Sequence, residues 1–314
     1  MSYTAPKETY SGSVYAVTLG TGDKAVTFGG ENVLTFHGFE GNTPNKPVIA
    51  HEIQDVAPAD WPEIVRKPLE AVSDDPVKWA KHCQDELGAS AIALRLIGTH
   101  PDSANRSADD AAGTVKAVLD AIDIPLIIMG SNHAEKDSEV LVKAAETAKG
   151  KNCLIGKAQE ANYKTIAAAA MANDHKIIAM SELDINLSKQ LNILITQMGY
   201  ANDKIVTDPM SSALGYGLEY TYSVMERIRL AALTQNDAVM QPPMMADIGF
   251  YVWKIKEVQA LESDLPEWGV LEDRAIAWEA SSAASMLVAG SELIIMRHPK
   301  AIEAVEKFID EMEG

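Results

Sequence analysis

Short apolar segments alternate with longer amphipathic segments along most of this chain. Eight segments are rich in β-branched and other apolar residues, and most end in a polar or turn-forming residue. They cover residues 47–55, 90–98, 124–132, 152–159, 175–180, 203–209, 237–243 and 292–299. Each is followed by a stretch of helix length with an apolar face. Strands that alternate with helices pair in parallel through helical crossovers. Eight such units predict an α/β fold, the closed (β/α)8 TIM barrel.

The predicted barrel does not include the N-terminal segment of the chain. The chain has 314 residues, and a barrel of this type needs about 250. We therefore predict a TIM barrel over 47–314 and an N-terminal β-hairpin extension over 1–46. The extension reads VYAVTLG, TGDK, AVTFGG and ENVLTFHGFEG, which are β-prone pieces separated by Gly-containing turns. We expect these hairpins to close the bottom or the side of the barrel. The glycines and lysine of 20–24 lack the G-x-x-x-x-G-K-[ST] spacing of a phosphate loop.

Residues 242–270 are longer than an ordinary connection between a barrel strand and its helix. We expect them to arch over the barrel mouth. Such a load of aromatic and methionine side chains requires burial, either on the chain's own barrel or on a partner. The side chains in question are Met244, Met245, Phe250, Tyr251, Trp253 and Trp268.

Composition narrows the function classes. The net charge of −18 and the pI of about 4.8 disfavour binding to a nucleic-acid backbone. No apolar stretch reaches the roughly 20 residues that span a bilayer, and the N-terminus lacks the apolar core of a signal peptide. A cytoplasmic protein without membrane contact is expected. The two cysteines, Cys83 and Cys153, form no C-x-x-C pair and cannot by themselves ligate a four-cysteine iron–sulfur cluster. We expect buried thiols.

The carboxyl ends of barrel strands meet at one mouth, where ligands bind. Polar residues stand at or just past the predicted strand ends and form a broad ring. They are Asp55, His100, Asn132, His133, Lys157, Gln159, Glu182, Asp184, Asp208, Gln241, Arg297 and His298. The seven histidines are scattered singly, and His51-Glu52 lacks the second histidine of H-E-x-x-H, so no metal site is predicted.

Two residue groups in this ring suggest chemistry. Lys157 could form a Schiff base if desolvation lowered its pKa, or it could be an ordinary lysine paired with a carboxylate such as Glu160. Asn132 and Asp208 could hold a heterocycle through matched donors and acceptors. Asp208 precedes a proline, so it could equally belong to a plain turn.

Long segments of the chain resemble a known family. They are IMGSNHAEKDSEVL (128–141), GKAQEANYKTIAAAAMANDH (156–175) and IVTDPMSSALGYGLEYTYSVMERIRLAAL (205–233), extended by 34–41, 92–102 and 241–257. These segments resemble the small subunit of the corrinoid iron–sulfur protein, the bacterial counterpart of the delta subunit of acetyl-CoA decarbonylase/synthase. The resemblance covers almost the full chain.

The resemblance implies a TIM-barrel subunit of a heterodimeric methyl carrier in the reductive acetyl-CoA (Wood–Ljungdahl) pathway. In that family a large corrinoid iron–sulfur subunit carries the cluster and the corrinoid domain, and cobalamin lies between it and the mouth of the small-subunit barrel. The methyl group comes from methyltetrahydrofolate through a methyltransferase and goes to acetyl-CoA synthase. This chain would cap the cobalamin, hold no iron–sulfur cluster and have no independent activity. It has no D-x-H-x-x-G run, in which a histidine replaces the lower cobalt ligand.

The family pattern carries no short catalytic motif onto this chain, so no catalytic residue is predicted. The expected contacts to the corrin's amide arms are chosen by their barrel position and are Asn132, His133, Gln159, Asp184, Asp208 and Arg297. Two other functions stay open. One is a free-standing pterin-dependent methyltransferase that uses Asn132 and Asp208, and the other is a Schiff-base lyase that uses Lys157.

Overall fold

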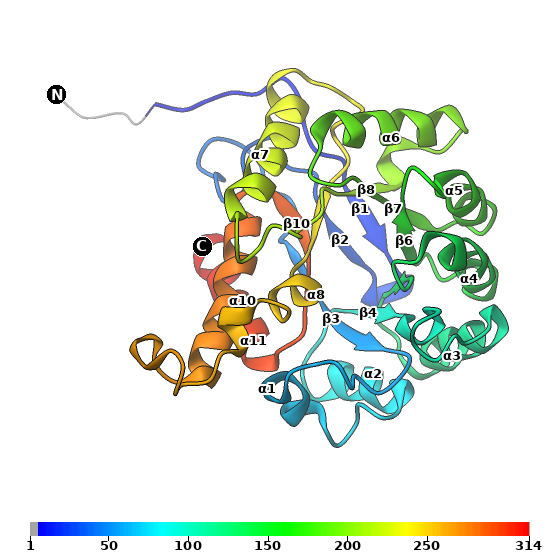
Figure 1. The fold of residues 1–314 in the computed structure, drawn as a ribbon. Coiled ribbons are helices and arrows are strands. Elements are labelled where there is room, and N and C mark those ends of the chain that lie inside the picture. The colour runs from blue at the N-terminus through cyan, green and yellow to red at the C-terminus, as the bar shows by residue number, and fades with distance from the viewer. Residues whose placement is uncertain (1–5, 314) are drawn as a thin grey trace.

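A computed structural model describes residues 6–313. The first five residues of the predicted N-terminal extension, and the last residue of the predicted barrel domain, lie outside the described part. Eight parallel strands close into a barrel in the order β10-β3-β4-β5-β6-β7-β8-β9 (Figure 1), which confirms the predicted fold class. The strands are β3 (Val48–Gln54), β4 (Ala91–Arg95), β5 (Leu126–Met129), β6 (Leu154–Ala158), β7 (Lys176–Met180), β8 (Ile205–Asp208), β9 (Met244–Asp247) and β10 (Ser291–Met296).

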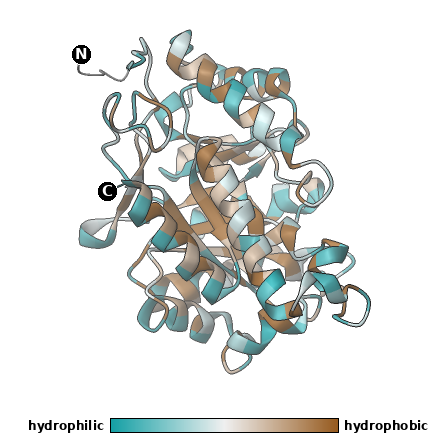
Figure 2. Cartoon of the chain, turned by 90° about the vertical axis from the view of Figure 1, so that its left-hand side faces the viewer, coloured by the Kyte–Doolittle hydropathy of each residue, from teal (hydrophilic) through white to brown (hydrophobic). Residues whose placement is uncertain are grey.

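Helices surround this barrel. Figure 1 shows α3 to α6 along one side and α10 and α11 along the other, and Figure 2 shows apolar residues concentrated on the strands and on the inner faces of the helices. The long helices are α2 (Pro76–Asp85), α3 (Ala108–Ala121), α4 (Ala134–Thr147), α5 (Tyr163–Ala172), α6 (Ile185–Gln197), α7 (Leu218–Thr234), α10 (Leu271–Val288) and α11 (Pro299–Glu313). Short helices are α1 (Glu63–Arg66), α8 (Ile248–Val252) and α9 (Lys256–Gln259).

Strand alternation divides the core into two parts. On β4, Ala91 and Ala93 belong to the cluster inside the barrel, whereas Ile92 and Leu94 belong to the larger cluster between the strands and the helices. Successive side chains of a strand point to opposite faces, so each strand contributes to both parts. The next inward position of β4 after Ala93 is Arg95, and it is charged. This change from small to charged residues marks the start of the barrel mouth.

A two-stranded hairpin closes the amino end of the barrel. β1 (Val17–Leu19) pairs antiparallel with β2 (Val26–Phe28), and Val17, Leu19 and Phe28 are fully buried within the inner cluster. Asn152, just before β6, donates through Nδ2 to the carbonyl oxygens of Thr18 and Gly20 at 2.9 and 3.0 Å. The hairpin therefore plugs the end of the barrel opposite the mouth.

The predicted strand character of 31–41 is wrong. This segment contains turns, including bonds from the His37 amide to the Leu34 carbonyl and from the Glu40 amide to the His37 carbonyl, at 3.0 and 2.8 Å. Phe36 has a φ of 61°, which breaks an extended strand. The ring of Phe36 instead packs edge-on against Phe308 of α11, with centroids 5.5 Å apart.

The seventh barrel strand was predicted seven residues too early. Residues 237–243 form a turn in which Asp237 accepts from the Val239 amide at 3.2 Å, and the strand is β9, 244–247. Pro242 and Pro243 have no N–H to donate to a ladder, so the strand begins only after them. Gln241 therefore lies at the amino end of the barrel, and its predicted place at the mouth is wrong.

Residues 248–270, between β9 and α10, form the connection that was expected to cover the mouth. They contain α8, α9 and the 3-10 turn Pro266–Trp268. Trp253 is buried against the chain's own core and stacks on His298, whereas Trp268 remains 44% exposed. Met244 and Met245 belong to the barrel wall and are buried. Within residues 6–313, none of the helices combines the length and the apolar character that crossing a bilayer requires.

Candidate functional site

Six charged side chains fill the inside of the barrel at its carboxyl end. We call this set the mouth network; its members are Glu52, Arg95, Lys157, Asp208, Asp247 and Arg297. All six are at most 5% exposed. They come from β3, β4, β6, β8, β9 and the residue that follows β10. Three are cations and three are carboxylates, so the network as a whole is neutral.

The mouth network is a continuous chain of ion pairs. Arg297 Nη2 donates to Glu52 Oε1 at 2.8 Å, and the same oxygen accepts from Arg95 Nε at 2.9 Å. Arg95 Nη2 also donates to Asp247 Oδ1 at 2.9 Å. Lys157 Nζ then lies 2.6 Å from Asp247 Oδ2 and 2.9 Å from Asp208 Oδ2. Buried charges cost little only when they are paired in this way.

The pairing outweighs burial in setting the protonation states. Burial alone raises the pKa of Glu52 and Asp247, but the neighbouring cations lower the pKa of both carboxyls below the ordinary value. Burial alone lowers the pKa of Lys157, but Asp208 and Asp247 raise that pKa above its ordinary value. Glu52, Asp247 and Lys157 therefore remain ionised at neutral pH.

Helix α8 covers the network. The ring of Phe250 lies 4.5 Å from the guanidinium carbon of Arg95, and the Tyr251 ring lies 5.9 Å from Lys157 Nζ. The guanidinium of Arg297 stacks 4.3 Å from the ring of Trp61, on the loop after β3. Aromatic faces attract cations and exclude water from them. The centre of the mouth is thus a sealed ionic layer.

Three of the six predicted contact residues lie at the rim above this layer. Asn132 is exposed and has a φ of 70°. Asp137 holds this turn, because its carboxylate accepts from the backbone amides of Ser131 and Asn132 at 2.8 and 2.9 Å. His133 is half-buried, caps α4 and packs edge-on against His100 with centroids 5.5 Å apart. Gln159, after β6, is also half-buried.

The structure does not bring the other three to the same surface. Asp208 and Arg297 are buried members of the mouth network. Asp184 is exposed and caps helix α6, where Oδ1 accepts from the amides of Asn186 and Leu187 at 2.7 and 3.1 Å. A carboxylate at a helix N-terminus accepts hydrogen bonds from N–H groups that have no partner within the helix. Capping of α6 therefore explains the position of Asp184.

Lys157 and Asp208 also bear on the two alternative functions. Asp208 Oδ1 accepts from the Met210 amide at 2.9 Å, so one oxygen of this carboxylate takes part in the turn that the Thr-Asp-Pro sequence predicts. The other oxygen pairs with Lys157. The condition for a Schiff-base lysine was a lowered pKa, whereas the pKa of Lys157 is raised. The partners of Lys157 are Asp208 and Asp247, not the expected Glu160.

Further residues of the predicted ring have structural partners. Glu279, buried on α10, accepts from the backbone amides of Arg297 and His298 at 2.8 and 3.0 Å. Asp55 accepts from the Gly98 amide at 2.8 Å and pairs with Arg106 at 3.1 Å. Residues 6–313 contain no group of three or more His, Cys, Asp or Glu side chains placed to hold a metal ion.

Both cysteines are buried, as expected. Burial raises the pKa of each thiol to about 12, which leaves both thiols unreactive at neutral pH. Cys83 lies on α2 and Cys153 directly precedes β6. Neither thiol therefore takes part in the chemistry of the mouth.

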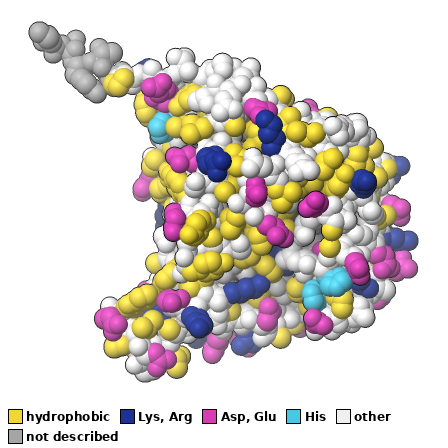
Figure 3. Space-filling model, turned by 45° about the horizontal axis from the view of Figure 1, so that its top comes forward, with side chains coloured by type: hydrophobic (Ala, Val, Ile, Leu, Met, Phe, Trp, Pro, Cys, Tyr) yellow, Lys and Arg dark blue, Asp and Glu magenta, His cyan; other side chains and the backbone are white. Residues whose placement is uncertain are grey.

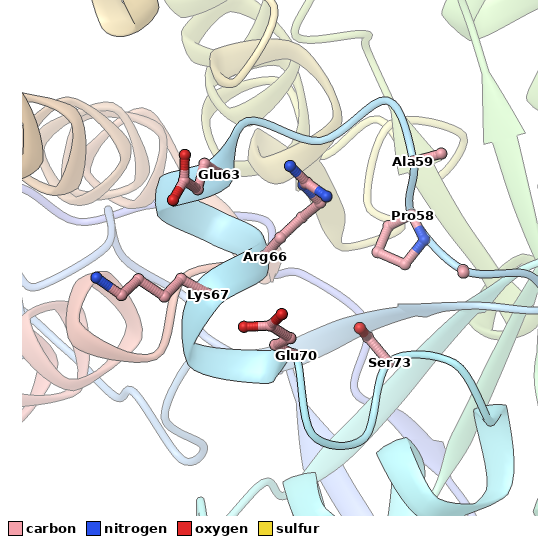
Figure 4. A pocket seen from close by; sticks show the side chains of 8 residues that line it. Pro58, Ala59, Glu63, Arg66, Lys67, Glu70 and Ser73 are labelled. Atoms are coloured by element: carbon pink, nitrogen blue, oxygen red, sulfur yellow. The ribbon is translucent and has the colours of Figure 1, made fainter.

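Open recesses remain around the sealed centre. The β3–β5 recess has a volume of about 510 Å³ and is lined by residues of the loops after β3, β4 and β5 together with Phe250 and Lys254. A second recess of about 330 Å³ lies beside Gln159 and Glu182. A third pocket of about 390 Å³ follows β3 (Figure 4), where Arg66 extends toward the loop of Pro58 and Ala59 and Lys67 points away from it. The charged residues of this third pocket are two acids and two bases, which gives it no net charge.

Sequence reasoning missed Glu52, Arg95 and Asp247, which with Lys157 form the centre of the mouth. A signal for them exists in the sequence. Each is a charged residue two positions after a small or apolar residue that faces the barrel interior, as Arg95 follows Ala93. A period of two within an apolar strand marks the inward face.

Comparisons with known proteins support the part of the resemblance that concerns the delta subunit of acetyl-CoA decarbonylase/synthase. The family model described as CO dehydrogenase/acetyl-CoA synthase delta subunit matches residues 16–304. An acetyl-CoA decarbonylase/synthase complex subunit delta 1 from Methanosarcina thermophila is 36% identical over 300 residues, which cover 94% of this chain and 68% of that protein. The corresponding delta subunit from Methanothermobacter thermautotrophicus is 35% identical over 307 residues, covering 97% and 77%.

Solved structures share the fold at low identity. Dihydropteroate synthase from Xanthomonas albilineans, with 4-aminobenzoic acid, superposes with a TM-score of 0.58 at 12% identity, covering 87% of this chain and 96% of that one. The enzyme from Yersinia pestis gives 0.55 at 16% identity, covering 86% and 95%. This likeness concerns the barrel alone. The family match spans most of the chain and the sequence identity exceeds a third, so this chain belongs to the family of CO dehydrogenase/acetyl-CoA synthase delta subunits.

Proposed function

We propose that this chain is a non-redox subunit of an acetyl-CoA decarbonylase/synthase type of system, and that its barrel mouth caps a cobalamin held by a larger corrinoid iron–sulfur subunit. The observation that carries the proposal is the mouth network. In this chain the space in which a barrel enzyme would hold its substrate is occupied by six paired charges and covered by α8. A filled mouth is suited to covering a ligand bound by another protein.

The rim residues fit the amide-bearing edge of a corrinoid. Asn132 and Gln159 are amides with exposed surface, and His133 keeps one ring nitrogen free of the bond that caps α4. Such groups can both donate to and accept from neutral amides. The Asp137 clamp on the Ser131–Asn132 turn holds one of them in place. A corrinoid bound by the partner would supply the cobalt ion that carries the methyl group from a methyltetrahydrofolate-dependent methyltransferase to acetyl-CoA synthase.

The surface around the mouth supports a protein partner. Five large hydrophobic side chains are exposed in the loops and first helical turn on the mouth side, namely Tyr216, Tyr220, Leu261, Trp268 and Val270. Figure 3 shows hydrophobic side chains interspersed with charged ones across one face of the molecule. Exposed apolar groups with a polar surround are typical of protein interfaces. The chain's own contribution would be to exclude water from the covered cofactor.

A free-standing pterin methyltransferase is less well supported. It requires Asn132 and Asp208 to reach one ligand, but Asp208 is fully buried against Lys157, whereas Asn132 is exposed and lines the β3–β5 recess. The likeness to dihydropteroate synthases concerns fold alone. A Schiff-base lyase requires a neutral Lys157, and the raised pKa of that lysine opposes this.

Co-expression with a cluster-bearing large subunit tests the proposal. We expect a stable heterodimer that retains cobalamin, and Asn132→Ala or Gln159→Ala should weaken cobalamin retention about fivefold, the effect of one hydrogen bond. Gln235→Ala is the matched control, because this exposed amide lies after α7, away from the mouth. Cobalamin content is read from its absorbance.

Three results would contradict the capping role. The isolated chain could transfer methyl from methyltetrahydrofolate to free cobalamin at enzymatic rates, or bind folate tightly without a partner, either of which would favour the pterin enzyme. Borohydride trapping of a substrate carbonyl on Lys157 would favour the lyase.

A further inference from the structure

The connection between α9 and α10 projects from the body of the molecule with apolar side chains uncovered. We call its residues 260–270 the arm; Figure 1 shows them in orange, extending away from the barrel. Leu261, Trp268 and Val270 of the arm are 58, 44 and 53% exposed. Exposed apolar side chains are ordinary when they are scattered singly, whereas a group of them marks an interaction site. Three in one short connection therefore indicate a surface that another molecule covers.

The arm is held in a defined shape. The Leu265 amide donates to the Leu261 carbonyl oxygen at 3.1 Å. The ring of Trp268 stacks on the ring of Trp278 in α10, with centroids 6.0 Å apart. The chain turns at Gly269, whose φ of 75° lies in the left-handed region that favours glycine. A segment that is already ordered loses little conformational entropy when it binds, so the arm is prepared to dock.

The arm is acidic, and its carboxylates lack cationic partners. Glu262, Asp264 and Glu267 are exposed, and the arm contains no lysine, arginine or histidine. None of the three carboxylates forms an ion pair with a cation of residues 6–313. They are therefore free to meet the cations of another molecule.

The residues that flank the arm do not neutralise it. Residues 256–259 and 271–274 together contain three acids and two bases. Lys300 of α11 adds a third base, since it pairs with Glu272 at 2.7 Å. The flanks are neutral as a whole, so the arm keeps an excess of three negative charges.

This charge decides which kind of molecule covers the arm. A nucleic acid and an anionic lipid surface both repel exposed carboxylates. A second copy of this chain carries the same net charge of −18, which opposes self-association. A basic protein surface with an apolar pocket matches both the charge and the apolar side chains of the arm.

We propose that the arm docks on the large corrinoid iron–sulfur subunit, at a site where lysine or arginine side chains surround an apolar pocket that receives Trp268. Only residues 253–259 separate the arm from α8, which covers the mouth network, so a subunit seated on the mouth is next to the arm. Trp268 is the anchor, because tryptophan is enriched among the residues that contribute most of the binding energy of an interface. The carboxylates of the arm steer the approach of the basic surface.

This inference rests on the proposed capping function and specifies how the partner is held. The two are separable by experiment, because cobalamin retention reports on the capping role, whereas the affinity between the subunits reports on the arm.

Binding of variants of the full chain to the large subunit tests the proposal. The measurement is the dissociation constant of the heterodimer, by surface plasmon resonance. Trp268→Ala should raise this constant about tenfold or more, as expected for the loss of a central aromatic anchor. Phe39→Ala is the matched control, because this ring is 59% exposed but lies outside the arm, and it should leave the constant unchanged. If Trp268→Ala unfolds the isolated chain, Leu261→Ala repeats the test at a more exposed side chain, with an expected loss of about fivefold.

The carboxylates give a second readout. Asp264→Asn combined with Glu267→Gln removes two negative charges from the arm. This pair should weaken binding about threefold at about 50 mM salt and have little effect at about 300 mM, where charges are screened more strongly. Asp120→Asn combined with Glu146→Gln is the matched control, because both carboxylates are exposed near the carboxyl ends of α3 and α4, outside the arm.

Hydroxyl-radical footprinting of the unsubstituted heterodimer gives a third readout. Trp268 should be protected from oxidation when the large subunit is bound. Phe39 should react equally in the isolated chain and in the heterodimer.

Three outcomes would overturn the role of the arm and leave the capping role in place, provided that the heterodimer retains cobalamin. They are equal dissociation constants for Trp268→Ala and Phe39→Ala, equal losses in the two carboxylate pairs, and full reactivity of Trp268 in the heterodimer. Self-association of the isolated chain through Trp268, or binding of the arm to anionic vesicles, would assign the arm to a different occupant and would also overturn the proposal. If the large subunit does not bind the unsubstituted chain, both proposals fail.

Discussion

The substitution Asp247→Asn tests whether the mouth network is held together by charge. Asp247 is fully buried, accepts from Arg95 at 2.9 Å and binds Lys157 Nζ at 2.6 Å. Asparagine keeps the size and shape but removes the negative charge, so the network changes from neutral to a buried excess of one positive charge. Breaking one partner of a buried ion pair costs about 3–5 kcal/mol.

The expected result is a fall of that size in the free energy of unfolding, measured by urea denaturation. The unfolding temperature should fall by about 10 °C in a chain of this length. Asp310→Asn is the matched control, because the side chain of Asp310 is 72% exposed and its pair with Lys46 is a surface ion pair. Such pairs contribute at most about 1 kcal/mol.

Two further measurements separate charge from packing. Adding Lys157→Met to Asp247→Asn restores the balance of charges, so the double variant should be more stable than the sum of the two single changes predicts. The pKa of Asp247 is lowered on folding, so its contribution is present above the pKa of the unfolded chain, about 3.9, and declines below it. The stability difference should therefore be constant above about pH 5 and narrow below about pH 4. A loss below about 1 kcal/mol at pH 7 would refute the reasoning.

Three more substitutions address other parts of the molecule. Phe28→Ala removes a fully buried ring from the β1–β2 hairpin and should lower the free energy of unfolding in urea by about 3–5 kcal/mol. Phe39→Ala is the control, because this side chain is 59% exposed and its loss should cost less than about 1 kcal/mol. Similar losses in the two variants would mean that the hairpin is not packed. Arg229→Met leaves the buried carboxylates of Glu31 and Glu292 without their cation and should lower the unfolding free energy by about 3 kcal/mol, so an unchanged midpoint would contradict the ion pairing. Burial raises the pKa of Glu279 to about 7, so the protonated carboxyl stabilises the fold and this contribution is lost as pH rises from about 4.5 to 7. The free energy of unfolding of Glu279→Gln, relative to that of the wild type, should therefore increase by up to about 3 kcal/mol over that range. A difference that does not change with pH would contradict the raised pKa.

The sequence by itself determined the class of fold. The spacing of apolar residues distinguishes strands, with a period of two, from helices, with a period of 3.6. Eight strands that alternate with helices allow few arrangements other than a barrel, because parallel strands need helical crossovers. The same reasoning located the hairpin of 17–28 and the burial of both cysteines. It misplaced the seventh strand because apolar residues such as Val239 and Met240 resemble a strand locally, while the two prolines that delay it act through missing ladder bonds.

Only the tertiary structure decided what occupies the mouth. Position after a strand indicates a place near the rim, but whether a side chain turns inward depends on register and on neighbours from other strands. Asp208 is the last residue of β8 and Asp184 lies in the loop after β7, yet Asp208 is buried against Lys157 and Asp184 caps a helix in solvent. The pairing of Glu52 with Arg95 and Arg297 joins residues as far apart as 245 positions, a contact that no local pattern encodes. Long-range charge pairing and the covering by α8 therefore define the site, since both arise only when the barrel closes.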